Sequence, residues 1–163
     1  MPALVTFRDR AMADAVLPAS IRSCLGLTDA SSVYDARRPR AVKQPTEVVL
    51  LWLPPIDRGR GGAHQVTEHR IRAHVRVRAM GDAARSGKQQ AEVVGTHLES
   101  LRAGFDGQRP WIDELEGDVL STRCEIEEQD VEPGDMGAIE GRVLLSVFTK
   151  GTGNRDGAES PGG

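Results

Sequence analysis

The clearest pattern in the chain is an unbroken alternation of apolar and polar residues from position 70 to position 78. One side of the alternation is apolar and consists of Ile71, Ala73, Val75 and Val77. The other side is almost wholly basic and consists of Arg70, Arg72, His74, Arg76 and Arg78. Because successive side chains of a strand point to opposite faces, this pattern predicts a half-buried strand with a basic outer face.

Four other segments have the hydropathy of strands. Leu120–Ile126 alternates in the same way, and its outer side is mainly acidic. Val48–Leu53 is a continuous apolar run between prolines, which is typical of a central strand buried on both faces. Gly141–Lys150 is apolar on both sides and predicts another central or covered strand, whereas Ser31–Tyr34 predicts only a short one.

Three segments have helical spacing. A capping pattern at Thr6 predicts a helix over Phe7–Leu17, which Pro18 breaks or kinks. A second, short helix is predicted over Ala19–Leu25, with the next glycine as its cap. A longer helix is predicted over Asp82–Ala103. Its apolar stripe continues just past this range and is formed by Ala91, Val94, Leu98, Leu101 and Phe105.

The order of these elements predicts an α+β domain over residues 1–150. Its core is expected to be a mixed, mainly antiparallel sheet of four to five strands, packed on one face by two helices. Ile56–His64 is rich in glycine and is expected to be a flexible connection. Residues 151–163 offer almost no apolar surface and are expected to be a disordered tail that folding does not need.

Composition limits the class of protein. The 163-residue chain is 39% apolar but only 4% aromatic, so its core must be aliphatic. No apolar run is long enough to cross a bilayer and the start lacks a signal-peptide core, so no membrane partner is expected. Two cysteines, Cys24 and Cys124, do not make a disulfide framework and are expected to be reduced and buried.

The charges are unevenly distributed although the net charge is only -3. Basic residues cluster between Arg37 and Arg78, and acidic residues dominate from Asp113 to Asp135. Such a layout suits head-to-tail contacts between identical subunits, and it equally suits ion pairs inside one subunit.

The sequence indicates no catalytic residues, metal ligands or cofactor. His69 and His74 lie five apart on a strand, so they point to opposite faces and cannot share a metal. Arg58–Ala63 fits the Arg-x-x-Gly-x-Ala pattern and resembles the acetyl-CoA loop of N-acetyltransferases. That loop must join a strand to a helix start, whereas here it precedes a strand. A hairpin tip is therefore favoured, and an N-acyltransferase is the lesser alternative.

Three roles are open for the basic row formed by Arg70, Arg72, Arg76 and Arg78. The arginines are solvated or pair across strands with Glu125 and Glu127, they contact the acidic stretch of a neighbouring subunit, or they contact nucleic-acid phosphates without reading bases. Loops supply further candidate contacts with partners, namely Arg37, Arg38, Arg40, Arg58, Arg60 and Trp111. Trp111 either plugs one end of the core or anchors a partner.

The element order and several segments resemble the tail-terminator, or tail-completion, proteins of long-tailed bacteriophages, prophages and gene-transfer particles. The segments are Thr46–Pro54, Glu68–Arg78, Ala91–Val94, Leu98–Leu101, Leu120–Ile126 and Arg142–Phe148. The resemblance covers about residues 1–150 and is one of layout, because the family has no catalytic signature. Residues 37–43 and the tail have no match in it.

The resemblance implies a non-enzymatic virion protein that forms a ring, commonly a hexamer, at the head-proximal end of the tail tube. Such a ring ends tube growth and offers a surface to the head connector. The implied partners are further copies of the chain, the tail tube protein, the head-completion or connector protein and, without sequence preference, the passing DNA. The resemblance places the protein in the virion after assembly in the cytoplasm of a host bacterium. Neck or head-closure proteins share this layout and are the alternative.

Overall fold

The fold is that of a computed structural model, which describes residues 6–13, 16–38, 44–61, 64–78, 87–108, 119–130 and 137–151. The helices in these ranges are α1 (Phe7–Ala11), α2 (Leu17–Leu25) and α3 (Gly87–Phe105), with a 3₁₀ turn, η1, at Ala30–Ser32. The strands are β1 (Val33–Asp35), β2 (Thr46–Trp52), β3 (Ile56–Gly61), β4 (His64–Arg78), β5 (Val119–Gln129) and β6 (Ala138–Gly151). The expected helix start at Asp82, the loop with Trp111 and the tail from residue 152 lie outside the described residues.

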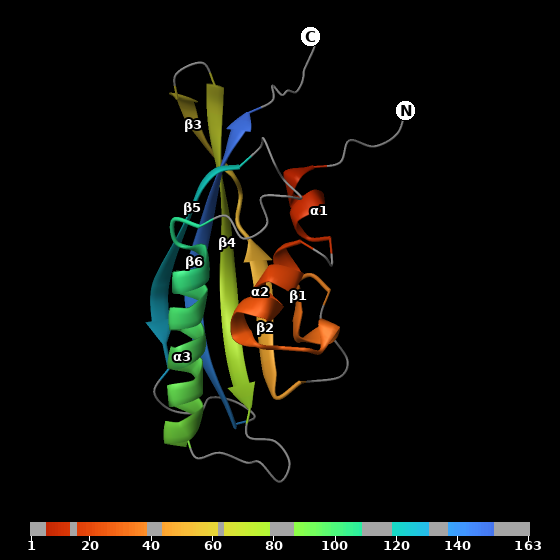
Figure 1. Cartoon of the computed structure of the whole chain (residues 1–163), viewed down its shortest axis with the longest axis vertical. Helices are drawn as coiled ribbons and strands as arrows, with labels where there is room; N and C mark the ends of the chain where they lie inside the picture. Colours follow the sequence, from red (N-terminus) through yellow and green to blue (C-terminus); the bar gives the residue numbers. More distant parts are fainter. Residues whose placement is uncertain are drawn as a thin grey trace.

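The six strands form one mixed sheet. The order of hydrogen-bonded strands is β1-β2-β4-β6-β5, and β3 forms an additional pair with β4. β1 and β2 are parallel, and every other described pair is antiparallel. Helices α1, α2 and α3 lie on the same side of the sheet (Figure 1). The predicted α+β class, with a mixed and mainly antiparallel sheet covered on one face, is confirmed.

The segment expected to be a flexible connection is a strand, and it raises the strand number to six. Ile56–Gly61 pairs with the first residues of β4, and Gly61 lies opposite His64. The register shifts between Asp57 and Arg60, where Gly59 has a φ of 77° that costs glycine little. Glycines that suggest a loop in the sequence therefore include one that kinks a strand. β3 and the adjoining ends of β4 and β6 extend beyond α2 and α3 (Figure 1).

The single helix predicted over Phe7–Leu17 is wrong, because two helices share this region. The Thr6 hydroxyl accepts a hydrogen bond from the Asp9 N–H at 3.1 Å, which caps α1 as expected. However, α1 ends at Ala11, and Pro18 lies in the first turn of α2. Proline suits a first turn because its fixed φ is helical and the N–H that it lacks would have no helical partner there. Pro18 therefore helps α2 to begin instead of breaking an earlier helix.

The core lies between the sheet and the helices. Its buried strand residues include Ile71, Val75, Val77, Ile139, Val143, Leu145 and Val147. Leu98 and Leu101 of α3 are only 1% and 2% exposed, which confirms the predicted apolar stripe. The helix lies very close to β6, because a Cβ added to Gly141 would fall 2.6 Å from Leu98 Cδ1. Only glycine leaves room for Leu98 at this position.

The two cysteines are free thiols that differ in burial. Cys124 is buried, and this burial raises its pKa to about 12. Cys24 is half-buried, with a pKa that burial also raises, and its thiol donates to the carbonyl oxygen of Ser100 at 2.9 Å. The expectation of burial therefore holds for Cys124 and only partly for Cys24.

His69 and His74 point to opposite faces of β4, as their spacing predicts. His69 faces the helices, where its ring stacks on Phe7 at 4.5 Å between centroids and lies 6.4 Å from the ring of Trp52. Its Nε2 is 3.2 Å from the Thr149 hydroxyl oxygen. Burial disfavours the charged imidazolium and lowers the pKa of His69 to about 4.

We expect the buried imidazole of His69 to make the free energy of unfolding depend on pH. The unfolded chain binds a proton near pH 6.5 and the folded chain only near pH 4, so stability falls as the pH drops through this window. The loss across it is about 2–3 kcal/mol. Urea unfolding of wild type and of His69→Gln between pH 7 and pH 4.5 measures it. The variant should lose most of the slope, and an equal slope in both proteins would contradict the prediction.

Candidate functional site

The face of the sheet opposite the helices carries most of the charged residues that the sequence singles out. We call it the outer face. β4 contributes to it the whole basic row, Arg70, Arg72, Arg76 and Arg78, together with His74. The strand register places Glu47 of β2 opposite Arg76 on one side and Glu140 of β6 opposite it on the other. The described helices all lie on the other side of the sheet (Figure 1).

One arginine of the row pairs with an acid predicted for it. The Nε of Arg72 donates to Glu127 Oε1 at 2.7 Å, and its Nη2 donates to Oε2 at 3.3 Å. This fork reaches from β4 over β6 to the edge strand β5, and both side chains stay about a third exposed, at 32% and 31%. Arg72 and Glu127 therefore pair across strands within one subunit, which is one of the roles predicted for the row. Glu125, the other acid expected there, pairs with none of the described residues.

Glu140 of β6 gathers three basic side chains. His74 Nδ1 lies 3.1 Å from Oε2, Arg76 Nε donates to Oε1 at 2.7 Å, and Arg142 Nη1 donates to Oε2 at 2.7 Å. The pKa of Glu140 is lowered to about 2, chiefly by the hydrogen bond from His74. Burial raises this pKa, but the hydrogen bond from Arg76 lowers it further. Arg142 also pairs with Glu128 of β5. A charge network thus crosses β4, β6 and β5.

Arg78 ends the row in a buried ion pair. Its Nη1 donates to Glu47 Oε1, and the Glu47 side chain is fully buried while that of Arg78 is 9% exposed. The same carboxylate accepts a hydrogen bond from the Gln44 N–H at 3.2 Å and lies 3.4 Å from the hydroxyl of Tyr34. This arginine therefore holds β2 against β4 and has little surface left for a partner.

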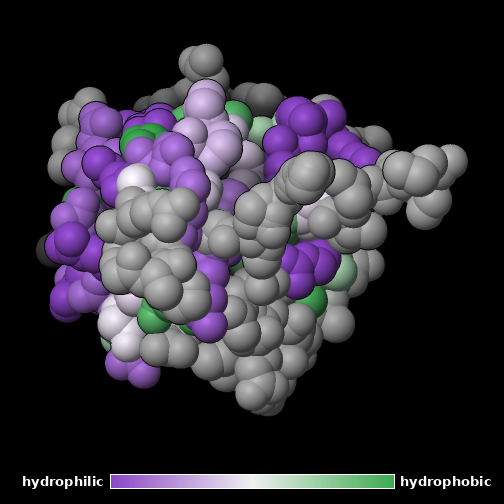
Figure 2. Space-filling model, turned by 90° about the horizontal axis from the view of Figure 1, so that it is seen from above, coloured by the Kyte–Doolittle hydropathy of each residue, from purple (hydrophilic) through white to green (hydrophobic). Residues whose placement is uncertain are grey.

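The opposite end of the row is more open. Arg70 Nη2 donates to the carbonyl oxygen of Pro54 at 3.3 Å, and Arg58 of β3 pairs with Glu68. Arg58, Glu68 and Glu125 line a shallow hollow together with Arg123, Leu144, Ser146 and Phe148. Arg123 and Glu125 are both exposed and pair with none of the described residues. Figure 2 looks onto the end of the molecule that carries β3, where hydrophilic residues predominate among those described.

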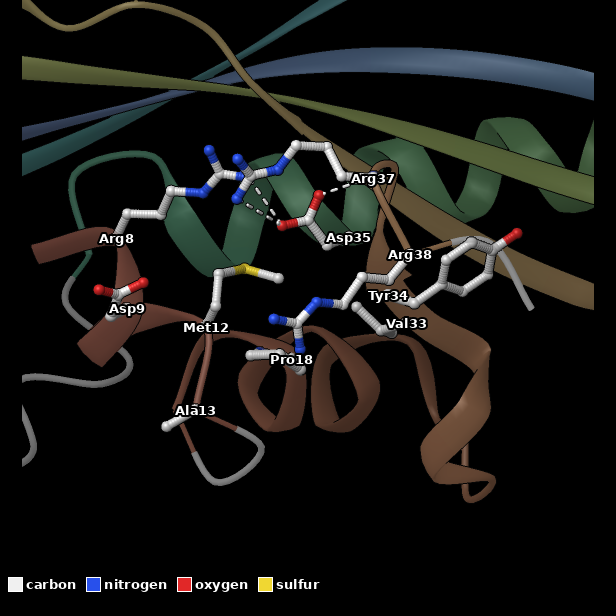
Figure 3. A pocket seen from close by; sticks show the side chains of 10 residues that line it. All are labelled: Arg8, Asp9, Met12, Ala13, Pro18, Val33, Tyr34, Asp35, Arg37 and Arg38. Atoms are coloured by element: carbon white, nitrogen blue, oxygen red, sulfur yellow. Dashed lines mark hydrogen bonds and ion pairs between the residues drawn. The ribbon is translucent and has the colours of Figure 1, made fainter. Parts of the chain in front are cut away.

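Arg37 and Arg38 lie directly after β1, beside a hollow of about 320 Å³. Arg8 of α1 and Arg37 both point toward Asp35, with Nη2–Oδ2 distances of 2.7 Å and 3.7 Å (Figure 3). Burial opposes ionisation of Asp35, but hydrogen bonds from the Arg37 N–H and the Arg8 side chain lower its pKa overall. Arg38 reaches into the same hollow and pairs with none of the described residues (Figure 3).

Sequence reasoning found the basic row but missed most of its partners. The charges on this face are neutralised largely by residues from other strands, namely Glu47, Glu128, Glu140 and Arg142. Only the strand register brings these residues to the row. Glu47 carries a signal in hindsight, because an acid inside an apolar strand needs a buried partner. Of the loop candidates, Arg40 and Trp111 lie outside the described residues, and so does the side chain of Arg60.

Neither a metal site nor a CoA-binding loop is formed by the described residues. Within them, no three His, Cys, Asp or Glu side chains are grouped to hold a metal ion. The glycine-containing strand β3 leads into strand β4, so the strand-to-helix junction that a CoA pyrophosphate requires is not formed there. None of the described helices has the length and apolar character to span a membrane.

Comparison with known proteins gives a fold relationship and no sequence family. No protein-family model matches the chain, and no curated protein matches it. A chain in the solved structure titled "Virion of native gene transfer agent (GTA) particle" is similar, with a TM-score of 0.51 and 12% sequence identity. The similarity covers 90% of this chain and 100% of that chain. The two chains therefore share an α+β fold over nearly their whole lengths.

Proposed function

We propose that this chain is a structural subunit of a phage-like particle, with no enzymatic role. The observation that carries the proposal is the shared fold, which extends over the whole of a chain from a gene transfer agent virion. The charged surfaces support it, since the exposed side chains of Arg37, Arg123 and Glu125 are suited to ionic contacts with other subunits.

Within such a particle, we propose the position of tail terminator. Copies of the chain form a ring, with six as the expected number, at the head-proximal end of the tail tube. The ring ends tube growth and binds the head-completion or connector protein on its other side. The protein would assemble in the cytoplasm of the host bacterium and remain in the virion.

The outer face suits the lumen of such a ring. Carboxylates from neighbouring strands lie among its arginines, and Arg72, Arg76 and Arg78 are each paired within the chain. A surface with balanced charge neither repels DNA phosphates nor holds them strongly, so DNA can pass. We therefore favour weak contact between this face and passing DNA over a strong phosphate grip by the basic row.

Deletion of the gene from a particle-producing strain tests the position. Electron microscopy of the particles should show tails of irregular length that do not join heads, and complementation with the full chain should restore uniform tails. Tails of normal length that fail to join filled heads would instead support the alternative, a neck or head-closure protein. Normal particles that lack the chain would contradict a virion role.

Reversal of two row arginines tests the lumen assignment. We expect Arg72→Glu/Arg76→Glu to lower monomer stability by about 0.2–1 kcal/mol for each lost pair. A further loss is expected because the new glutamates repel Glu127 and Glu140. The variant should still enter particles, but DNA retention or delivery should fall, since the reversed face repels phosphate. Particles of the variant are examined for DNA content and delivery beside wild-type particles. Unchanged DNA delivery would exclude a role for the row in the lumen.

A further inference from the structure

We infer that the two opposite edges of the sheet bind each other between neighbouring copies of this chain. The inference rests on the proposed ring and names the surfaces that would build it. β1 and β5 end the strand path, so the surfaces beside them lie on opposite sides of the molecule (Figure 1). When subunits join through two unlike surfaces, each subunit that is added leaves one surface of each kind free at the ends of the assembly. The assembly closes into a ring when the rotation between neighbouring subunits brings these two ends together.

The surface beside β1 is basic, and we call it the basic hollow. Arg8, Arg37 and Arg38 lie around it with the carboxylates Asp9 and Asp35, which neutralise only part of the arginine charge (Figure 3). Arg37 keeps 67% of its side chain exposed. The apolar lining includes Met12 and Pro18. The hollow therefore suits an acidic surface with a small apolar group at its centre.

The surface beside β5 has this complementary character, and we call it the acidic groove. It runs between α3 and β5, and its lining includes Glu92 and Glu99 from the helix and Ile126 from the strand. Glu92 is exposed and pairs with none of the described residues, while Glu99 is 58% exposed and pairs with Arg102. Ile126 is 38% exposed, which makes it one of two large apolar side chains exposed in the described ranges.

The backbone of β5 is partly occupied at its free edge, which favours a contact through side chains. The Cys124 N–H donates to Asp106 Oδ1 at 3.0 Å, and the Gly107 N–H donates to the carbonyl oxygen of Thr122 at 2.7 Å. These bonds occupy the free edge of β5 where a further strand would pair. A neighbouring copy therefore cannot pair with the backbone at these two residues, but it can cover Ile126 and face the glutamates with its arginines.

A second copy of this chain is the occupant that both surfaces fit. An apolar centre with a charged rim is the usual composition of a specific interface, and opposite rims favour one orientation. The outer face fits less well as the contact between copies, because Arg72, Arg76 and Arg78 already pair with carboxylates of the same chain. In the two edge surfaces, Arg38 and Glu92 pair with none of the described residues.

A charge swap between two variants tests the inference on the purified full-length chain. The first variant is Arg37→Glu/Arg38→Glu, and the second is Glu92→Lys/Glu99→Lys. Mass is measured by light scattering and native mass spectrometry over a concentration series, with thermal melting to verify folding. Arg123→Glu, an exposed arginine outside both surfaces, is the control for a charge reversal as such.

We expect wild type and Arg123→Glu to assemble, and each double variant alone to require about tenfold or more higher concentration. A 1:1 mixture should assemble like wild type, because each reversed edge meets its reversed counterpart in alternating subunits. Assembly of either variant alone at wild-type concentrations, or no rescue in the mixture, would overturn this interface while leaving the ring intact. Wild type that stays monomeric throughout would overturn the interface and the ring together. The virion role is judged separately by the deletion experiment.

Discussion

Arg78→Met should lower the free energy of unfolding by about 3–5 kcal/mol, because it leaves a buried carboxylate without its cation. The Glu47 side chain is fully buried, and Arg78 is the described basic residue that pairs with it. Gln44 and Tyr34 still supply a hydrogen bond and a hydroxyl contact, but neither carries a positive charge. Urea unfolding at neutral pH measures the loss.

Two further variants separate the buried charge from lost packing. Arg72→Met removes an arginine from the same strand face, but its pair with Glu127 is about a third exposed, so the cost should stay below about 1 kcal/mol. The double variant Glu47→Gln/Arg78→Met removes both charges and should recover most of the loss. A cost below about 1 kcal/mol for Arg78→Met alone would show that Glu47 is not stabilised by this pair.

Leu98→Ala should lower the free energy of unfolding by about 2–5 kcal/mol. Leu98 is 1% exposed and fills the space above Gly141, where α3 lies against β6. Truncation removes apolar contacts and leaves a cavity, because a helix held along its whole length cannot collapse into the gap.

Leu51→Ala is the matched control for the Leu98 prediction. Leu51 lies on the outer face and is 37% exposed, so its truncation should cost less than about 1 kcal/mol. Both variants are compared with wild type by urea unfolding. A loss of less than about half a kcal/mol for Leu98→Ala would contradict the packing of α3 on the sheet.

Local sequence pattern was enough wherever one element has one buried side. The period of two at 70–78 placed the arginines on one face and the aliphatic residues in the core, because the pleat fixes side-chain direction. The spacing of Leu98 and Leu101 likewise placed both on the buried stripe of α3. The same reasoning separated His69 from His74 and gave the α+β class.

Local pattern misled where two opposite outcomes share the same residues. Proline both stops a helix and begins one, so Pro18 could not show where the chain enters α2. Glycines mark loops and also kinks within strands, so only the pairing of Ile56–Gly61 with β4 reveals β3.

By itself, then, the sequence determined the aliphatic core, the charged strand face and the class of fold, since these depend on periodicity along single elements. Only the tertiary structure decided which charges are neutralised and which edges stay open, because those depend on residues far apart in the chain. Glu140 meets Arg76 only when β6 pairs with β4 in one register, and a slip of one residue would turn it to the other face. The basic hollow and the acidic groove are separated for the same reason, because the strand path places β1 and β5 at opposite ends of the sheet.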